Sequence, residues 1–350
     1  MTVCEDVQSL GVWQVNGTGS RMTIGVRDGL KIENANCSLC GQCITHCPVG
    51  ALRERDDTDE VYAAIDDPEK IVVLQIAPAV RVALGEHFGF KPGTTTTGQI
   101  VTALRMIGFD MVYDTGFAAD LTVIEEGNEF LARLKTGERL PQFTSCCPAW
   151  VKFAEQYFPD MLPNLSTCRS PQQMFGSLCK EKLTKDLNIP REALVVVSIM
   201  PCTAKKFEAN REEFRTRGNK DVDYVLTTRE LAVMIKERGI EFDKLEPGSF
   251  DMPFGFKSGA AVIFGTSGGV SEAVLRYASY VTGSGAFKEY SSLRADEGIK
   301  ITEVAAGDAR LRLAVVSGLG NARRLIDRIR RGEESFDLIE VMACCGGCIN

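Results

Sequence analysis

From about residue 71 onward, short apolar runs alternate with longer amphipathic stretches. Apolar runs bounded by Gly, Pro or polar residues predict buried strands at 71–76, 109–113, 194–200, 260–264, 313–316 and 336–341. Apolar residues at helical spacing predict helices over 100–106, 170–187, 228–238, 271–280 and 321–331. Strands that alternate with helices indicate an α/β fold with mostly parallel sheets flanked by helices.

Residues 1–68 have a different pattern. They lack long periodic segments and contain turn-forming pairs such as Asn16-Gly17 and Asp28-Gly29. An acidic, polar stretch over 56–70 contains the break Asp67-Pro68. We therefore expect a small domain over 1–68, followed by a larger α/β domain over 69–350.

The composition narrows the functional class. The chain has 350 residues, of which 44% are hydrophobic and 25% charged, as in an ordinary globular protein. Forty Lys and Arg against 47 Asp and Glu give a net charge of −7, which disfavours nucleic acid and anionic lipid as partners. The longest apolar runs, at 71–80 and 193–200, are shorter than the roughly 18 residues of a membrane span. The first residues do not resemble a secretory signal.

Cysteine is the unusual residue type. The chain contains 13 Cys and only two His. In a chain without a secretion signal the thiols would be kept reduced, so metal binding is favoured over disulfides. An odd total also argues against complete pairing. The cysteines gather in separate groups along the sequence, which indicates more than one site.

The first group has the spacing of a bacterial ferredoxin. Cys37-Ser-Leu-Cys40-Gly-Gln-Cys43-Ile-Thr-His-Cys47-Pro48 reads C-x2-C-x2-C-x3-C-P, a spacing that favours a 4Fe-4S cluster. Zinc, which prefers two well-separated pairs, and purely structural thiols are the alternatives. In such runs the fourth Cys serves another cluster, so Cys37, Cys40 and Cys43 need one more ligand. Cys4 is the nearest candidate, unless it is an incidental terminal thiol.

The second group follows predicted strands. Cys147, Cys202 and Cys344 come after such segments, and Cys348 lies four residues after Cys344. Ligand sites in open α/β sheets lie outside the carboxyl ends of strands, so these thiols are candidates for a second 4Fe-4S cluster. Adjacent side chains diverge, so Cys146 cannot easily bind the same iron as Cys147. We expect a free thiol near the metal that carries protons, with a buried inert Cys as the alternative.

Three segments carry a family resemblance. Thr144-Ser-Cys-Cys-Pro-Ala-Trp150, Met200-Pro-Cys-Thr-Ala-Lys-Lys-Phe-Glu208 and Glu340-Val-Met-Ala-Cys-Cys-Gly-Gly-Cys348 resemble the signature segments of the iron-iron (FeFe) hydrogenases. The resemblance implies a two-lobed H-cluster domain over 69–350, preceded by a truncated ferredoxin-like α+β domain over 1–68. Relative to the family, the chain looks incomplete at both ends, which would leave Cys47 without its cluster.

The resemblance also implies a set of site residues. The cubane of the H-cluster would be held by Cys147, Cys202, Cys344 and Cys348, and Cys348 would bridge to a diiron unit with CO, cyanide and a bridging dithiolate amine. Cys146 would pass protons to that amine, and Lys205 would hydrogen-bond a cyanide. The wall would include Met200, Met342, Gln172, Ala77 and Pro78. From the residues alone, Lys205 would be a solvated lysine and the methionines ordinary core residues.

A proton route is the last element of the site. Glu126, Glu129 and Arg133 share a helical face by their spacing of three and four residues, and Ser166 could relay between them. From the residues alone, a solvated acidic start of a helix is the favoured interpretation. The resemblance instead implies a path through Cys146, Glu126, Ser166, Glu129 and Arg133.

The resemblance implies reversible reduction of protons to H2. Electrons would arrive from ferredoxin or a similar carrier through the cluster of Cys4, Cys37, Cys40 and Cys43. Maturation enzymes would supply the diiron unit. The expected location is the cytoplasm, or a hydrogen-producing organelle if the source is eukaryotic. The alternatives are a hydrogen-sensing relative, a plain electron carrier, or a non-enzymatic iron-sulfur assembly protein, and such assembly proteins generally lack the thiol and the lysine.

Overall fold

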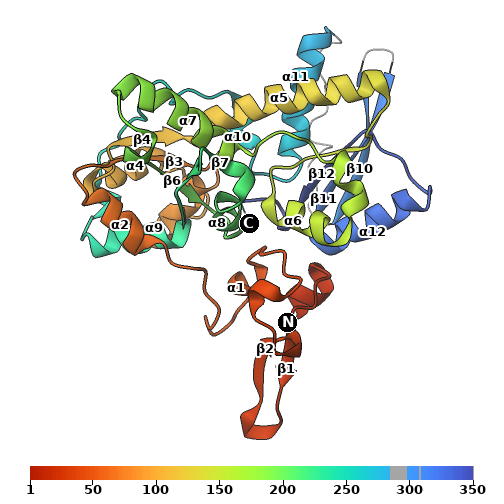
Figure 1. Ribbon diagram of the computed structural model, residues 1–350, viewed down its shortest axis with the longest axis horizontal. Helices are drawn as coiled ribbons and strands as arrows, with labels where there is room; N and C mark the ends of the chain where they lie inside the picture. The colour runs from red at the N-terminus through yellow and green to blue at the C-terminus, as the bar shows by residue number, and fades with distance from the viewer. Residues whose placement is uncertain (284–297, 307–308, 350) are drawn as a thin grey trace.

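The N-terminal part forms a small lobe of its own. The computed structural model describes residues 1–283, 298–306 and 309–349. In Figure 1 the antiparallel hairpin of β1 (Trp13–Asn16) and β2 (Thr23–Val26) projects away from the rest of the molecule. The other elements of this lobe are short helices, namely η1 (Val3–Val7), η2 (Gly19–Arg21), η3 (Arg27–Gly29), η4 (Ile32–Asn34) and α1 (Gln42–Thr45).

The first of the two large sheets is entirely parallel. Its strand order is β4 (Met111–Asp114), β3 (Ile71–Ile76), β6 (Leu194–Met200) and β9 (Tyr224–Thr227). All seven residues of β6 are buried, as a strand covered on both faces requires. Ile76 pairs with both Asp114 and Ile199, so the three strands end at the same edge.

The second sheet is mixed. Its order is β10 (Ile299–Ala306), β11 (Ala309–Ser317), β12 (Leu338–Met342) and β5 (Gln142–Phe143), and only the β10–β11 pair is antiparallel. Met342 at the end of β12 pairs with Ser317 at the end of β11. The carboxyl ends of both sheets therefore supply loops that can form a shared site.

Helices flank both sheets, as Figure 1 shows. The longer ones are α4 (Thr97–Ile107), α5 (Thr115–Thr136), α6 (Pro148–Tyr157), α7 (Pro171–Leu187), α9 (Thr228–Glu237), α11 (Gly269–Thr282) and α12 (Leu319–Arg330). The shorter elements are α2 (Thr58–Ile65), α3 (Val80–Ala83), η5 (Leu84–Phe88), η6 (Pro159–Asn164), η7 (Arg191–Ala193), α8 (Ala204–Ala209), η8 (Glu212–Phe214), β7 (Arg215–Thr216), β8 (Asn219–Lys220), η9 (Phe242–Lys244) and α10 (Gly259–Ile263). None of the helices in the described ranges combines the length and apolar composition needed to cross a bilayer.

Helix α5 joins the two lobes of the larger domain. It packs against α7 on one side and against α10 and α11 on the other, and Figure 1 shows it running along both lobes. Asp114 caps its first turn by accepting the N–H of Gly116 at 2.7 Å. A Cβ at Gly127 would lie 2.5 Å from the ring of Tyr277, so glycine permits the close crossing of α5 and α11.

The α/β fold with parallel sheets is confirmed, but one predicted strand is wrong. Residues 260–264 lie largely in the helix α10, whose cap Ser258 accepts the N–H of Ala260 at 3.1 Å. A short apolar run does not distinguish a buried strand from a helix, and here the capping residue decides for the helix. The sequence predicted a helical face through Glu126, Glu129 and Arg133 but not the full length of α5, and it missed the short β5 and β9, because none of these elements has a long apolar run.

Candidate active site

The loops that follow the parallel strands enclose a cavity of about 100 Å³. Segments from both sheets meet there, together with Cys40 from the N-terminal lobe. The lining includes every wall residue named from the sequence, namely Ala77, Pro78, Gln172, Met200 and Met342. Further lining residues are Ala79, Thr115, Ala119, Cys146, Cys147, Pro148, Ala149, Pro171, Pro201, Cys202, Lys205, Phe264, Gly265, Ala343, Cys344, Gly347 and Cys348.

Four thiols enter the cavity from three strand ends. Cys147 follows β5, Cys202 follows β6, and Cys344 and Cys348 follow β12. Burial raises the pKa of Cys202 to about 11 and that of Cys348 to about 12, and neighbouring thiols of the set add to both increases. The free thiols of Cys202 and Cys348 are thus neutral at physiological pH. Coordination to a metal reverses this preference, because the cation deprotonates the thiol.

Backbone contacts fix the loop that carries Cys348. The N–H of Cys348 donates to the carbonyl of Gly265 at 2.7 Å, and the N–H of Ser267 donates to Gly346 at 3.1 Å. Gly347 has a φ of +94°, and a Cβ there would lie 2.7 Å from Gly265 O and from Ser267 N. The loop therefore requires glycine at position 347 for both conformation and space.

Lys205 is a lysine with only 12% of its side chain exposed and a defined partner. Its Nζ donates to both carboxylate oxygens of Glu208 at 3.0 Å and to the carbonyl of Cys146 at 3.1 Å. Burial alone would lower the pKa of Lys205, but the carboxylate of Glu208 raises it above its ordinary value. The interpretation of Lys205 as solvated is wrong. Glu208 escaped the sequence analysis, although its spacing of three residues from Lys205 was a usable signal.

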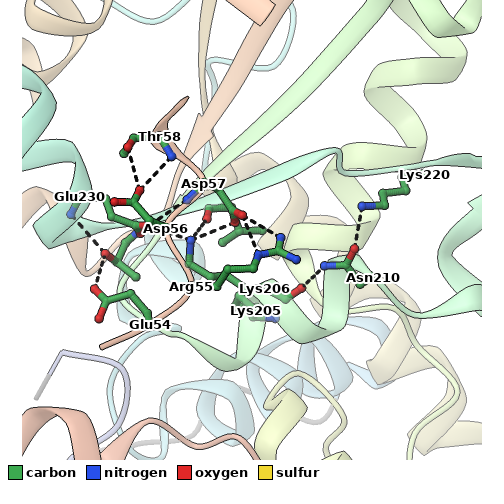
Figure 2. A network of polar contacts seen from close by, with 12 residues as sticks. Glu54, Arg55, Asp56, Asp57, Thr58, Lys205, Lys206, Asn210, Lys220 and Glu230 are labelled. Carbon is green, nitrogen blue, oxygen red and sulfur yellow. Dashed lines mark hydrogen bonds and ion pairs between the residues drawn. The ribbon is translucent and has the colours of Figure 1, made fainter. Parts of the chain in front are cut away.

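A second lysine anchors the helix that carries Lys205. Figure 2 shows Lys206 reaching Asp57 of the linker and Glu230 of α9. Its buried Nζ donates to Asp57 Oδ2 at 3.0 Å and to Glu230 Oε1 at 2.9 Å. Removal of Lys206 would leave two buried carboxylates facing each other without their shared cation. The two contacts therefore hold α8, and with it the direction of Lys205, in one arrangement.

The predicted proton-route residues form a largely buried polar chain on α5 and the loop before α7. Ser166 Oγ donates to Glu129 Oε2 at 2.8 Å, and Arg133 Nη2 donates to Glu129 Oε1 at 2.7 Å. Ser166 lies close enough to Glu126 to oppose the increase in its pKa, and Glu126 interacts electrostatically with Cys146. Glu126 Oε1 has no hydrogen-bond partner within the described residues. Glu126 is 1% exposed, and burial raises its pKa to about 8. The interpretation as a solvated helix start is wrong, because Glu126 and Glu129 lie well past the first turn of α5, where Glu126 is buried and Glu129 is half-buried.

The thiols of the N-terminal lobe form a second group. Cys37, Cys43 and Cys4 interact electrostatically, and Cys40 interacts with Cys37 and Cys43. Burial raises the pKa of Cys40 to about 12, again the behaviour of a thiol that needs a metal to ionise. Cys4 is itself buried beside this group, which favours the predicted fourth ligand over an incidental thiol.

A comparison with known protein families shows which family this chain belongs to. The family described as iron only hydrogenase large subunit, C-terminal domain, matches residues 70–350, and a 4Fe-4S binding domain matches residues 30–53. The chain belongs to the iron-only hydrogenase family. These two matches indicate a 4Fe-4S cluster and an H-cluster as its cofactors.

Several relatives of this hydrogenase family are similar over most of the chain. The NADP-reducing hydrogenase subunit HndD of Solidesulfovibrio fructosivorans is 49% identical over 99% of this chain and 61% of its own length. Iron hydrogenase 1 of Clostridium pasteurianum is 44% identical over 92% of this chain and 64% of its own length. The chain thus spans less than two thirds of these two relatives. The mouse (Mus musculus) cytosolic iron-sulfur assembly component 3 is 31% identical over 97% of this chain and 74% of its own length.

Solved hydrogenase structures share the fold. The apo [FeFe]-hydrogenase HydA1 from Chlamydomonas reinhardtii, variant C377H, aligns with a TM-score of 0.74 at 39% identity. The alignment covers 85% of this chain and 84% of that one.

The donor set of this iron-only hydrogenase homologue fits the expected clusters. Within the described residues, no three His, Cys, Asp or Glu side chains are arranged to hold a single metal ion. A 4Fe-4S cube instead takes one Cys at each of its four irons, so its ligands stand further apart than those of one ion. Four half-buried thiols around one cavity, with thioethers and a lysine beside them, suit such a group.

Proposed function

We propose that this chain is the catalytic part of an FeFe hydrogenase, which interconverts H2 with protons and electrons. One observation carries the proposal: four strand-end thiols, the additional thiol of Cys146 and the buried Lys205 line the same cavity. A scaffold that only stores a cubane needs the four thiols and neither of the other two groups. Their presence favours hydrogenase chemistry over the assembly-protein alternative.

The chain would hold its cofactor through four cysteines and Lys205. Cys147, Cys202, Cys344 and Cys348 would bind the cubane, and Cys348 would also bind the diiron unit. When bound, the H-cluster would supply the redox chemistry. The three N–H donors of Lys205 face the two carboxylate oxygens of Glu208 and the carbonyl of Cys146, so a cyanide would share or replace one of these contacts. Met200 and Met342 exclude water from the cavity with apolar thioethers.

The buried polar chain supplies protons to this dry site. Cys146 is neutral because burial raises its pKa well above the ordinary value, so its Sγ carries a proton. Glu126 also carries a proton at pH 7, since its pKa is about 8. Toward the cavity, the Ser166 hydroxyl would accept a proton from Glu129, which Arg133 holds at the outer end, and pass its own to Glu126, which would reprotonate Cys146. Such a relay replaces each proton that leaves Cys146.

Electrons would reach the cavity through the N-terminal cube. Cys4, Cys37, Cys40 and Cys43 would hold that cube, and Cys40 also lines the catalytic cavity. The expected electron donor is ferredoxin or a similar carrier in the cytoplasm, and maturation enzymes would insert the diiron unit. The hydrogen-sensing alternative shares this site and would differ in its turnover.

The test is H2 formation by anaerobically matured protein supplied with a chemical reductant. We expect steady H2 production that collapses in Cys146→Ser while the iron content is kept. Cys47→Ser, a change at a thiol outside the cavity lining, should retain the activity. Matured protein that carries full iron but forms no H2 would refute the proposal and favour the assembly alternative.

A further inference from the structure

One side chain of the N-terminal lobe reaches a thiol of the catalytic cavity directly. Gln42 Nε2 donates to Cys344 Sγ at 3.1 Å. Gln42 lies in α1, between Cys40 and Cys43, and its backbone N–H donates to the sulfur of Cys40. One residue thus contacts a sulfur from each of the two thiol groups.

The position of this contact is fixed by the packing of the two lobes. Gly41, just before α1, has a φ of +74°, and a Cβ there would lie 2.3 Å from Thr203 Oγ1. The N-terminal lobe therefore rests closely on the residue that follows Cys202. A second glutamine of the N-terminal lobe, the fully buried Gln8, donates to the carbonyl of Ala343, the residue before Cys344, at 2.9 Å.

Gln8 also fixes the position of the segment that leads to Cys344. Its Oε1 accepts the N–H of Leu319 at 3.2 Å, so its amide is satisfied on both sides. Ala343 is thereby held at its backbone by one glutamine, and Cys344 is held at its sulfur by another. Both glutamines come from segments that carry predicted ligands of the N-terminal cube, since Gln8 follows Cys4 by four residues.

We propose that Gln42 sets the reduction potential of the catalytic cubane by donating an N–H···S hydrogen bond to Cys344. The inference rests on Cys344 being a cubane ligand, as in the proposed function. Reduction adds negative charge to the cluster and its sulfurs, and a hydrogen-bond donor stabilises that charge. A ligand sulfur bears no hydrogen, so the amide can face it favourably only with its NH2 group. Gln42 therefore raises the potential of the catalytic cubane.

The side chain and the backbone of Gln42 serve different cubes, which makes the role separable. A side-chain substitution removes the donor to Cys344 and leaves the backbone N–H at Cys40 in place. The catalytic cubane should change while the N-terminal cube keeps its properties. Gln42 is in this sense a positioning residue that acts through Cys344.

The experiment measures midpoint potentials rather than turnover. The chain is reconstituted with iron and sulfide without maturation enzymes, and its clusters are reduced stepwise at set potentials under EPR observation. Cys344→Ser identifies the signal of the catalytic cubane. In Gln42→Met, a substitution of similar length without a donor, the midpoint of that signal should fall, and the other midpoint should stay. Gln14→Met is the matched control, because Gln14 donates to Asn16 within the hairpin at 2.8 Å.

Three outcomes would overturn the proposal. They are an unchanged midpoint in Gln42→Met, an equal shift in Gln14→Met, and loss of cluster iron in both Gln42→Met and Gln42→Leu, which would assign the side chain to cluster retention. The test is independent of catalysis. A wild-type chain that holds both cubes but makes no H2 refutes the proposed function and leaves the Gln42 result valid.

Discussion

The hydroxyl of Ser166 donates to Glu129 Oε2 at 2.8 Å and links the loop before α7 to the buried face of α5. The N–H of Thr167 donates to the same carboxylate at 3.0 Å, so Glu129 keeps a partner even without the hydroxyl. The Ser166 contact is therefore suited to a proton relay more than to structural support.

Ser166→Ala should interrupt proton delivery without unfolding the chain. We expect H2 formation to fall by roughly 10²-fold or more, the usual contribution of a positioned proton-transfer group. Iron content and the thermal midpoint should change little. Ser166→Thr keeps a hydroxyl and should retain most activity, whereas equal activity in the Ala and Thr variants would exclude Ser166 from the route.

The stability of the chain should fall as pH rises through the range in which Glu126 ionises. Burial raises the pKa of Glu126 to about 8 and that of Glu340 to about 7, each from an ordinary value of 4.5. Between pH 4.5 and about 8, the folded state thus binds more protons than the unfolded state. The stabilisation from neutral Glu126 is fully present below pH 4.5 and is lost as the pH rises through about 8.

Glu126→Gln removes one of these groups and should flatten the pH dependence. At 1.36 kcal/mol per pKa unit, the upper limit of the Glu126 contribution is roughly 5 kcal/mol. Anaerobic thermal midpoints at pH 5.5 and 8.5 would check this expectation. A wild-type midpoint that rises between those two pH values, or an equal slope in both proteins, would contradict the assignment of a neutral Glu126.

Gly347→Ala should prevent assembly of the catalytic cubane and leave the rest of the fold intact. Its Cβ would lie 2.7 Å from Gly265 O and Ser267 N, so the loop that carries Cys348 must move. Iron and sulfide analysis should show loss of one cube. Gly93→Ala is the matched control, because Gly93 also has a positive φ, of +77°, but nothing lies within 4 Å of its Cβ position. Full iron content in Gly347→Ala would show that the loop tolerates displacement.

The sequence predicted the chemistry of the site better than its shape. The spacing of Cys37, Cys40, Cys43 and Cys47 and the positions of Cys147, Cys202 and Cys344 after strands were enough to propose two clusters. Thiol spacing carries this information because coordination constrains local sequence. The N-terminal and catalytic domain boundary at residue 68 remains a prediction, close to the start of the family match at residue 70.

The sequence did not predict contacts between segments that lie far apart in the chain. The apolar run at 260–264 predicts a strand, although an apolar run without periodicity fits a strand or a helix equally well. The cap at Ser258 favours the helix that the structure shows. The residues alone predicted a solvated Glu126, because its burial depends on how α5 packs between the two lobes. Gln42 reaches Cys344 across 302 residues, a relationship with no local signal.

The infrared spectrum of the anaerobically matured chain tests the central claim most directly, because CO and cyanide ligands absorb where protein does not. We predict CO and cyanide bands in the matured wild type, their absence before maturation, and their loss in Cys348→Ala with the fold retained. A matured chain with full cubane iron but without these bands would contradict the assignment of a diiron unit to this cavity.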